Sequence, residues 1–515
     1  MGELVRLAEL TGAVARAADG GIGFPPETSF RLCLVAVALA RALGMADEEV
    51  RDVYHASLLR HAGCTASAHE ETILAGDELE LRSSIALGDA GSPKDMLSRL
   101  VRGVGRKETL SKRVRIVGTM LARAPAALPV ALKGRCEVAI RFAVRLGLGP
   151  RVARALDEAF ERWDGKGLPL GKKGRDVCLQ ARIVSLAELA ASYVAVGGVS
   201  AARAVVAARS GGHVDPDLAA RFVEDANSLL QDALAPSVWD RVLEVEPEPV
   251  AYVGVTQQKA MAELLADFAD LKSTFTLGHS RGVAARAVHG ALALGANEQE
   301  RGQLEIAALI HDIGRVAISN AIWDKPGPLA RGEMEEVRTH SFHTDRIVSS
   351  IGGAIGEVAE LASALHERLD GSGYHRRLSG PGVTKWVRVL AAADVAQALA
   401  EARPHRPALT TAEATATMRE LVARGALCPR AVDAVLGASE GRARRRPSFP
   451  AGLSEREIEV LRLVARGLTD KEVAERLGIS HRTVHHHNKH AYDKIGVSTR
   501  AAAALFLVEH ELLDG

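Results

Sequence analysis

Apolar residues recur at helical spacing along almost the whole chain. In one example, Ile306, Leu309, Ile310 and Ile313 lie at positions i, i+3, i+4 and i+7 and therefore share one face of a helix. No segment alternates between apolar and polar residues over more than a few positions, as a half-buried strand would. The pattern predicts an all-α fold.

Two stretches of the chain resemble each other. Four pairs of segments match in the same order: residues 42–64 with 293–314, 161–169 with 367–375, 181–189 with 387–395, and 213–222 with 427–436. The offset is 250 residues for the first pair, in which His61 stands opposite His311, 206 residues for the next two and 214 residues for the last. Because chance similarity at one motif would not preserve this order, we predict two copies of one helical domain, the first with 44 additional residues.

Two interruptions of the helical pattern indicate domain boundaries. Acids and prolines break the pattern at residues 245–255, and the stretch GRARRRPSFP is typical of a basic linker. We therefore predict a first helical domain at 1–245, a second at 255–440, a linker at 441–450 and a small domain at 451–515.

The composition is that of a globular protein, with 47% hydrophobic and 25% charged residues. Such values exclude long disorder, collagen-like repeats and a disulfide scaffold. The 65 Lys and Arg residues are balanced by 64 Asp and Glu residues, so the net charge is only +1. Any affinity for nucleic acid must therefore come from a local basic patch.

Cysteine usage and the N-terminus bear on the compartment. The five cysteines form no CxxC pair, which is typical of a protein in a reducing compartment without a zinc knuckle. The N-terminus lacks a basic-then-apolar signal pattern, and uncharged apolar stretches fall short of the ~18 residues that span a bilayer. We expect a cytoplasmic protein that makes no use of a membrane.

Local signals divide residues 451–515 into helices. Ser454 with Glu457, and Thr469 with Glu472, are capping boxes that begin two helices, and Ser480 begins a third. A glycine turn separates the second helix from the third. This is the helix-turn-helix arrangement, whose second helix enters the major groove of DNA.

The third of these helices lies in a basic stretch. Residues 476–500 contain five basic side chains and one acid, which is the charge pattern expected of a DNA-binding surface. Side chains on its outer face are candidates for base or phosphate contacts, and those at its N-terminus for phosphate contacts. These candidates are Ser480, Arg482, Thr483, His485, His486 and Lys489.

The C-terminal segments LSEREIEVLRLVARGLTDKEVAERLGIS, TVHHH and KIGVSTR resemble the LuxR-type helix-turn-helix over the full length of this domain. The resemblance implies binding to double-stranded DNA, as a homodimer when on DNA. The sequence departs from the family at Asn488, where an apolar residue is usual.

A second set of candidates carries imidazole and carboxylate groups. His311 and Asp312 are adjacent at the end of an apolar helix, where both side chains can turn toward one ion. Other candidates follow in order along the chain: His279, His340, His366 and Asp394. A lone histidine is usually structural, but this ordered series predicts a divalent metal site.

Around these residues the chain reads HDIGR, DKPGPL, LHERLDGSGYH, ADVAQAL and RPHRPAL. Over residues 255–440 the series resembles the HD superfamily of metal-dependent phosphohydrolases, and within it the HD-GYP type. Active members hydrolyse cyclic di-GMP or related cyclic dinucleotides, which implies a cyclic dinucleotide or other nucleotide ligand and a divalent iron, manganese or zinc ion. The resemblance implies that Asp312 bridges two ions and acts with Arg315 in catalysis. The resemblance also implies that His279, His311 and Asp394 bind the first ion and that His340 binds the second. His366 is a further implied metal ligand.

Three departures from the HD-GYP pattern are visible. Leu365 stands where the family has the first of two paired histidines, so we expect an intact first metal site and an impaired second one. Arg315 replaces a lysine, and His375 replaces the proline of GYP. The adjacent Arg376 and Arg377, in a glycine-bracketed loop, are candidates for phosphate binding, although an ordinary glycine turn fits the sequence equally well.

The first copy has lost more of the pattern. Ala62 replaces the bridging carboxylate, Phe160 stands where His366 stands, and Glu188 replaces Asp394. No counterpart of His279 occurs near residues 28–29. We expect this copy to be a structural partner or a sensor.

Three interpretations of the whole chain remain open. The first is a transcription regulator whose tandem HD-like domains sense or process a ligand. The second is a phosphohydrolase that its tail localises on DNA. The third is a structural pair of HD folds that dimerises the tail.

Overall fold

The computed structural model describes residues 4–106, 108–437 and 449–513. Residues Arg6–Tyr252 form one compact unit, the N-terminal unit, and a second, the C-terminal unit, consists mainly of Val253–Gly515. Among the described residues, the named strands are β1 (Val5–Arg6) and β2 (Tyr252–Val253), which pair with each other. Residues 441–448 of the predicted linker lie outside the described residues, and the predicted domain boundaries stay predictions.

The N-terminal unit is built around α2 (Thr28–Ala42), which is apolar on nearly all its faces. This helix packs against α3 (Asp47–Leu59) and α9 (Leu179–Ala208), and Phe30 and Leu34 are buried in its core. The other helices of the unit are α1 (Leu7–Ile22), α4 (Ala68–Ala75), α5 (Glu78–Ile85), α6 (Pro93–Gly103), α7 (Leu110–Arg145), α8 (Pro150–Asp157), α10 (Pro216–Leu229) and α11 (Val238–Glu244), with 3-10 turns η1 (Cys64–Ser67), η2 (Gly174–Asp176) and η3 (Asp232–Leu234).

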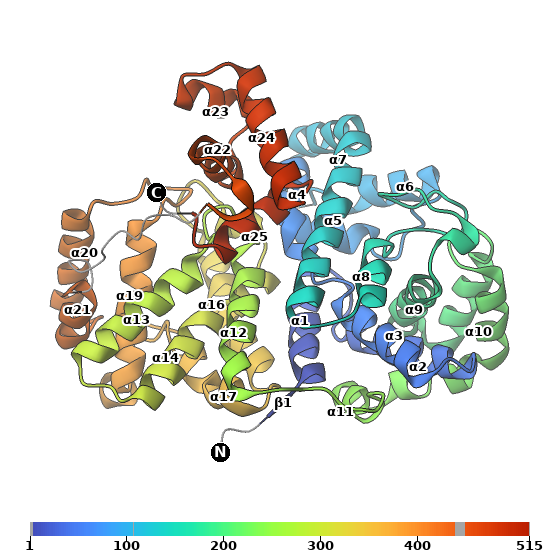
Figure 1. Ribbon diagram of the computed structural model, residues 1–515, viewed down its shortest axis with the longest axis horizontal. Helices are drawn as coiled ribbons and strands as arrows, with labels where there is room; N and C mark the ends of the chain where they lie inside the picture. The colour runs from blue at the N-terminus through green and yellow to red at the C-terminus, as the bar shows by residue number, and fades with distance from the viewer. Residues whose placement is uncertain (1–3, 107, 438–448, 514–515) are drawn as a thin grey trace. The chain divides into compact units, whose positions relative to one another are not determined.

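In the C-terminal unit the central helix is α13 (His279–Ala293). It packs against α14 (Glu298–Ile310), α19 (Lys385–Ala400) and α21 (Pro429–Leu436), and Figure 1 shows α13 between α14 and α19. The remaining helices before residue 438 are α12 (Val255–Asp270), α15 (Asn320–Trp323), α16 (Arg331–Val348), α17 (Gly353–Glu357), α18 (Ala359–Ser363) and α20 (Thr411–Ala423), with 3-10 turns η4 (Ile313–Ala317) and η5 (Gly380–Gly382).

Each unit, taken by itself, contains the same pair of hydrogen bonds between an aspartate and a serine. In the C-terminal unit the carboxylate of Asp270 accepts hydrogen bonds from the backbone N–H and the hydroxyl of Ser280, and in the N-terminal unit Asp19 accepts the same two from Ser29. This equivalence places Thr28 where the other unit has His279. The predicted all-α fold with two HD-like copies is confirmed.

The C-terminal residues form η7 (Pro450–Gly452) and four helices, α22 (Glu455–Ala465), α23 (Asp470–Leu477), α24 (His481–Ile495) and α25 (Arg500–Glu509). The capping boxes of Ser454 with Glu457 and Thr469 with Glu472 are formed, and the hydroxyl of Ser480 accepts from the Thr483 N–H. Val473 and Val484 pack α23 and α24 into one small core with α22. The predicted helix-turn-helix is confirmed.

Within the described ranges, two helices could cross a membrane by length and composition alone, namely α7 and α9. Core helices of soluble proteins pass the same test, and α9 packs against α2, α3 and α10 within its unit. Charged residues such as Lys133 in α7 and Glu188 in α9 interrupt both helices, so neither contains a long uncharged apolar stretch.

Candidate metal centre and DNA interface

Four elements of the C-terminal unit and one loop bring the predicted metal ligands together. His279 is the first residue of α13, His340 lies on α16 and Asp394 on α19. His311 and Asp312 follow the end of α14, and His366 lies in the loop after α18. All six side chains are buried or nearly so.

A glycine fixes the approach of α16 to this site. A Cβ atom at Gly314 would lie only 2.0 Å from the carbonyl oxygen of His340 and 2.6 Å from the backbone nitrogen of Thr344. The side chain of Thr344 accepts from the Gly314 N–H and donates to the His311 carbonyl oxygen. The glycine of HDIGR thus lets the His340 helix lie directly against the turn that carries Asp312.

Asp312 lies at the middle of the cluster. Its carboxylate and the imidazoles of His279 and His311 have donor atoms within 4.8 Å of one another, and so do Asp312, His340 and His366. The Asp312 Oδ2 atom faces the first group, 3.2 Å from His311 Nε2, whereas Oδ1 faces the second, 3.5 Å from His340 Nε2. One carboxylate is therefore shared by two sets of donors, as the bridging role requires.

Four atoms of the cluster have no hydrogen-bond partner within the described part of the chain. The Nε2 atoms of His311, His340 and His366, and Oδ1 of Asp312, are buried and have no hydrogen-bond partner among the described residues. Buried polar atoms without partners are costly in folded proteins, so convergent ones require an explanation such as an ion. Imidazole nitrogen with carboxylate oxygen suits iron, manganese or zinc. The residues present therefore fit a divalent metal ion.

In three of the four imidazoles, the other nitrogen fixes the direction of the ring. His311 Nδ1 lies 2.7 Å from the Ala308 carbonyl oxygen, and His340 Nδ1 lies 2.5 Å from that of Val337. His279 Nδ1 lies 2.9 Å from Glu401 Oε2 instead. A partner on Nδ1 selects the tautomer in which Nε2 offers its lone pair to the cluster.

Neighbouring charges and burial shift the pKa values of the side chains in this cluster. Burial alone would raise the pKa of Asp312, but the Arg315 guanidinium and His311 hold it well below its usual value. Burial alone would lower the pKa of His279, but Glu401 and Asp394 raise it to about 10. Burial and the neighbouring His366 lower the pKa of His340 to about 3. Asp312 is thus held as the anion that a bridging ligand must be.

Two residues that depart from the HD-GYP pattern are well packed. Arg315 donates to Asp312 Oδ2 at 2.6 Å, and its guanidinium lies 3.8 Å from the centre of the Trp323 ring. Leu365 is fully buried. Its side chain is apolar, whereas the histidine of the HD-GYP pattern at this position has imidazole nitrogens. His366 stacks on Tyr374, with ring centres 5.2 Å apart.

The predicted phosphate-binding arginines lie in a loop that Glu367 holds. The carboxylate of Glu367 accepts hydrogen bonds from the backbone N–H groups of Arg376, Arg377 and Leu378. Both arginines are exposed, and the Arg376 guanidinium pairs with Glu360 at 2.7 Å and with Asp345 at 3.1 Å. Arg376 therefore has two carboxylate partners within its own unit.

The corresponding place in the N-terminal unit holds an ion pair. His61 Nε2 lies 2.9 Å from Glu188, and the buried guanidinium of Arg60 pairs with the same carboxylate. Arg60 also donates to the Ala159 carbonyl oxygen. Ala62 and Thr28 provide neither a carboxylate nor an imidazole group, and the arginine side chain of Arg60 pairs with Glu188 in this copy.

Sequence reasoning missed the residues that support His279. Glu401 and Arg403 lie beside its Nδ1 atom, and Gln397 donates to Glu401 at 2.8 Å. Arg403 belongs to the RPHRPAL motif, so a signal for it was present. Glu401 carries no such signal, because it meets His279 only through the packing of α19 against α13.

On α24 the predicted DNA-contacting side chains share an exposed face. Arg482, His485, His486 and Lys489 are exposed, whereas Val484, Ala491 and Ile495 face the core of the domain. Among the first set, His485 lies 3.5 Å from Asp470 of α23. The remaining two candidates, Ser480 and Thr483, are exposed at the N-terminus of the helix.

Asn488 lies on the inner side of α24. It is half-buried, and its Oδ1 atom has no hydrogen-bond partner among the described residues. The departure from an apolar residue at this position therefore leaves a polar atom partly desolvated inside a small domain.

Comparison with known families defines the class of the two described regions. Residues 263–426 match the HD domain family, and residues 451–507 match the LuxR family of bacterial regulatory proteins. The protein thus carries an HD domain followed by a LuxR-type DNA-binding domain.

Individual relatives are phosphodiesterases. The chain is 29% identical over 422 residues to 3'3'-cGAMP-specific phosphodiesterase 3 of Vibrio cholerae, covering 80% of this chain and 90% of the relative. It is 39% identical over 145 residues to the cyclic di-GMP phosphodiesterase response regulator RpfG of Xanthomonas campestris, covering 28% and 38%. The crystal structure of V-cGAP3, a cyclic GMP-AMP phosphodiesterase of V. cholerae, matches with a TM-score of 0.59 at 26% identity, covering 86% of this chain and 99% of that one.

Proposed function

We propose that the protein is a DNA-binding transcription regulator whose HD domain binds a cyclic dinucleotide at a metal centre. The observation that carries the proposal is the cluster of buried, unpartnered donor atoms around Asp312, in a chain that also carries a LuxR-type domain. Relatives named for cyclic GMP-AMP or cyclic di-GMP support this class of ligand.

His279, His311, Asp312 and Asp394 would hold the first ion, and His340 and His366 would join Asp312 at the second. Divalent ions bound there would neutralise the charge of a phosphodiester. Arg315 orients Asp312 through its 2.6 Å hydrogen bond, and Glu401 orients His279. Because Leu365 withholds a donor, we propose one firmly held iron, manganese or zinc ion and a weaker second one.

Hydrolysis of the cyclic dinucleotide is the second candidate function. It is favoured by the position of Asp312, whose two oxygen atoms face separate donor groups. In this alternative the tail localises a phosphodiesterase on DNA.

The same full-length protein can test both candidates. Calorimetry with cyclic di-GMP and with 3'3'-cGAMP, each with and without Mn²⁺, measures binding, and chromatography of the mixtures measures linear products. We expect the cyclic dinucleotide to bind only when Mn²⁺ is present, and we expect Asp312→Asn to abolish this binding. The matched control is Asp433→Asn, at an exposed site on α21, which should bind like the wild type. Binding that Asp312→Asn leaves intact would contradict the proposed site, and product formation would establish the enzyme.

We further propose that the protein acts in the cytoplasm as a homodimer on DNA, because helix-turn-helix dimers read two half-sites with paired recognition helices. Light scattering of the protein with and without an operator duplex tests the stoichiometry. A complex with one chain per duplex would contradict it.

A further inference from the structure

Helix α24 is rich in histidine. Five of the chain's 18 histidines lie within its 15 residues, and four of these five are exposed. His486 and His490 are four positions apart, which places them on one face of the helix, one turn from each other. The centres of their rings lie 3.9 Å apart. Two imidazoles therefore meet on the surface of the helix that carries the candidate DNA contacts.

The spacing of this pair suits a metal ion. Two histidines at positions i and i+4 on one helix face are a recurrent zinc-binding arrangement. Each imidazole nitrogen lies about 2.0–2.1 Å from a bound zinc ion, so two such nitrogens are at most about 4 Å apart. Because their ring centres are 3.9 Å apart, His486 and His490 can bind the same ion.

A carboxylate follows on the same face. Asp493 is exposed and lies three positions after His490 and seven after His486, so the three side chains form one stripe over two turns. Asp493 is the one acid in the basic stretch 476–500. Its charge repels the phosphates of DNA, whereas carboxylate oxygen is a usual ligand of zinc beside imidazole nitrogen. Two imidazoles and a carboxylate make a three-ligand zinc site, in which water takes the fourth position.

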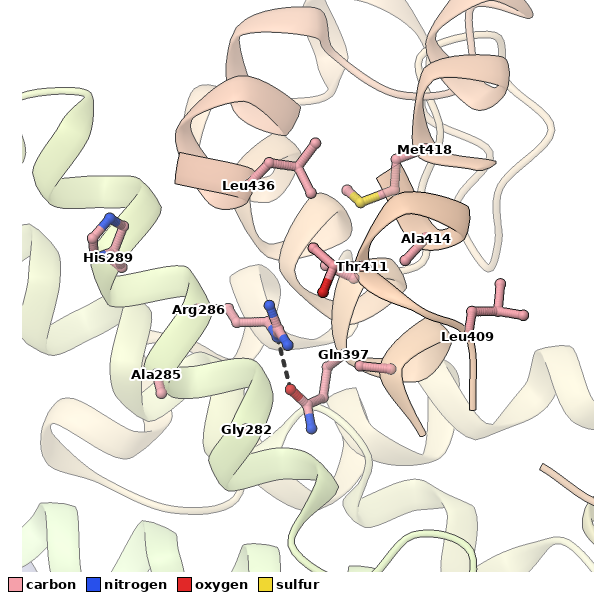
Figure 2. A pocket seen from close by; sticks show the side chains of 12 residues that line it. Gly282, Ala285, Arg286, His289, Gln397, Leu409, Thr411, Ala414, Met418 and Leu436 are labelled. Atoms are coloured by element: carbon pink, nitrogen blue, oxygen red, sulfur yellow. Dashed lines mark hydrogen bonds between the residues drawn. The ribbon is translucent and has the colours of Figure 1, made fainter. Parts of the chain in front are cut away.

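A single histidine elsewhere in the molecule lacks such neighbours. Figure 2 shows His289 on α13 at a cavity of about 330 Å³. Among the described residues that line this cavity, no other carries an imidazole, thiol or carboxylate group. Because zinc takes several protein ligands, the stripe on α24 is the better zinc site of the two.

We infer that His486, His490 and Asp493 bind one Zn²⁺ ion, and that this ion and DNA exclude each other on α24. Zn²⁺ binding stands by itself, whereas the exclusion rests on the proposed DNA interface. The imidazole of His486 cannot bind an ion and a DNA group with the same nitrogen. The major groove is about 12 Å wide and a helix with its side chains measures about 10–12 Å, so a hydrated ion on this face does not fit between helix and groove. Zn²⁺ would thus release the protein from DNA.

Calorimetric titration of the full-length protein with Zn²⁺, without DNA, tests the site. We expect His490→Gln to bind one ion per chain fewer than the wild type, and Asp493→Asn to bind that ion more weakly. Ions held by the HD domain are common to these proteins, so the difference isolates α24. The matched control is His481→Gln, an exposed residue of the same helix whose neighbour one turn on, His485, lies 3.5 Å from Asp470. Equal Zn²⁺ uptake by the wild type and His490→Gln, or a loss in His481→Gln alone, would overturn the inference.

Fluorescence anisotropy tests the exclusion. The probe is a labelled duplex selected from random-sequence DNA by its binding to the full-length protein in EDTA. At a free Zn²⁺ concentration about ten times the dissociation constant, mutual exclusion should weaken duplex binding by the wild type about tenfold. In His490→Gln the same Zn²⁺ concentration should leave duplex binding unchanged, because the HD domain of this variant still binds its ions.

The outcomes separate the two halves of the inference. Zn²⁺ binding on α24 that leaves duplex affinity unchanged, or an equal loss of affinity in His490→Gln, would refute the exclusion and leave the zinc site standing. Absence of any duplex binding in EDTA would instead refute the proposed DNA interface, which the Zn²⁺ titrations do not involve.

Discussion

Removing the charge of Lys489 or Arg482 on the exposed face of α24 should weaken DNA binding in a salt-dependent way. Both side chains are exposed on one side of the helix, opposite Val484 and Ala491 in the core. The matched control is Lys494→Ala on the same helix. Lys494 donates to the buried carboxylate of Glu457 at 2.7 Å and so serves the fold of the domain.

The expected magnitude follows from counterion release. Each phosphate contact contributes a slope of about −0.9 in a plot of log affinity against log salt. If Lys489→Ala removes one phosphate contact per chain, the slope of log affinity against log salt should become less negative by about 1.8 for a homodimer. For a monomer the change should be about 0.9. Over a fourfold change in salt, the dimer's loss corresponds to a factor of about 12 in affinity.

Fluorescence anisotropy of a labelled operator duplex at several salt concentrations measures these slopes for the full-length protein. Lys494→Ala should lower the thermal stability of the C-terminal domain and leave the slope nearly as in the wild type. Equal slopes for the wild type, Arg482→Ala and Lys489→Ala would refute the assignment of this face of α24 to DNA.

Three further predictions concern metal and stability. Leu365→His should raise the metal content per chain, measured by elemental analysis, because it restores a nitrogen donor beside His366; unchanged content would show that the position does not face the second ion. His61→Ala should leave metal content unchanged, and a loss would reveal a ligand in the N-terminal unit. Burial alone would raise the pKa of Glu71, but Arg135 and Arg82 lower it to about 2. Its stabilising contribution is therefore present above the unfolded value of 4.5 and is lost as pH falls toward 2. Glu71→Gln should cost about 3–5 kcal/mol at pH 7 and progressively less below pH 4.5 in thermal unfolding, and a constant difference would contradict this.

The helices of the C-terminal domain were predictable because their signals are local. Ser454 and Glu457 are three residues apart, and the capping box they form depends on little else in the chain. The all-α fold was predictable for a similar reason, since apolar spacing is read within one or two turns. Residue Asn488 shows the limit of such reasoning, because its half-buried position depends on how α24 packs against its neighbours.

The donor cluster was predicted as a set of residues, but its supporting contacts were not. His279 and Glu401 are 122 residues apart and meet because α13 packs against α19. No periodicity or motif encodes that contact. The pairing of Arg376 with Glu360 and Asp345 is of the same kind, since it joins residues 16 and 31 positions apart, and phosphate binding by Arg376 stays a prediction.

The two HD-like copies solve one electrostatic problem in different ways. In the N-terminal unit Glu188 is buried, and the guanidinium of Arg60 with the imidazole of His61 balances its charge within the protein. In the C-terminal unit Asp312 and Asp394 are buried together. A buried anion needs a partner of opposite charge, which Arg315 provides for Asp312 and a proton on His279 provides for Asp394. We propose that a divalent ion displaces this proton in the C-terminal copy, whereas Glu188 of the N-terminal copy keeps its arginine partner, so that only one copy responds to metal.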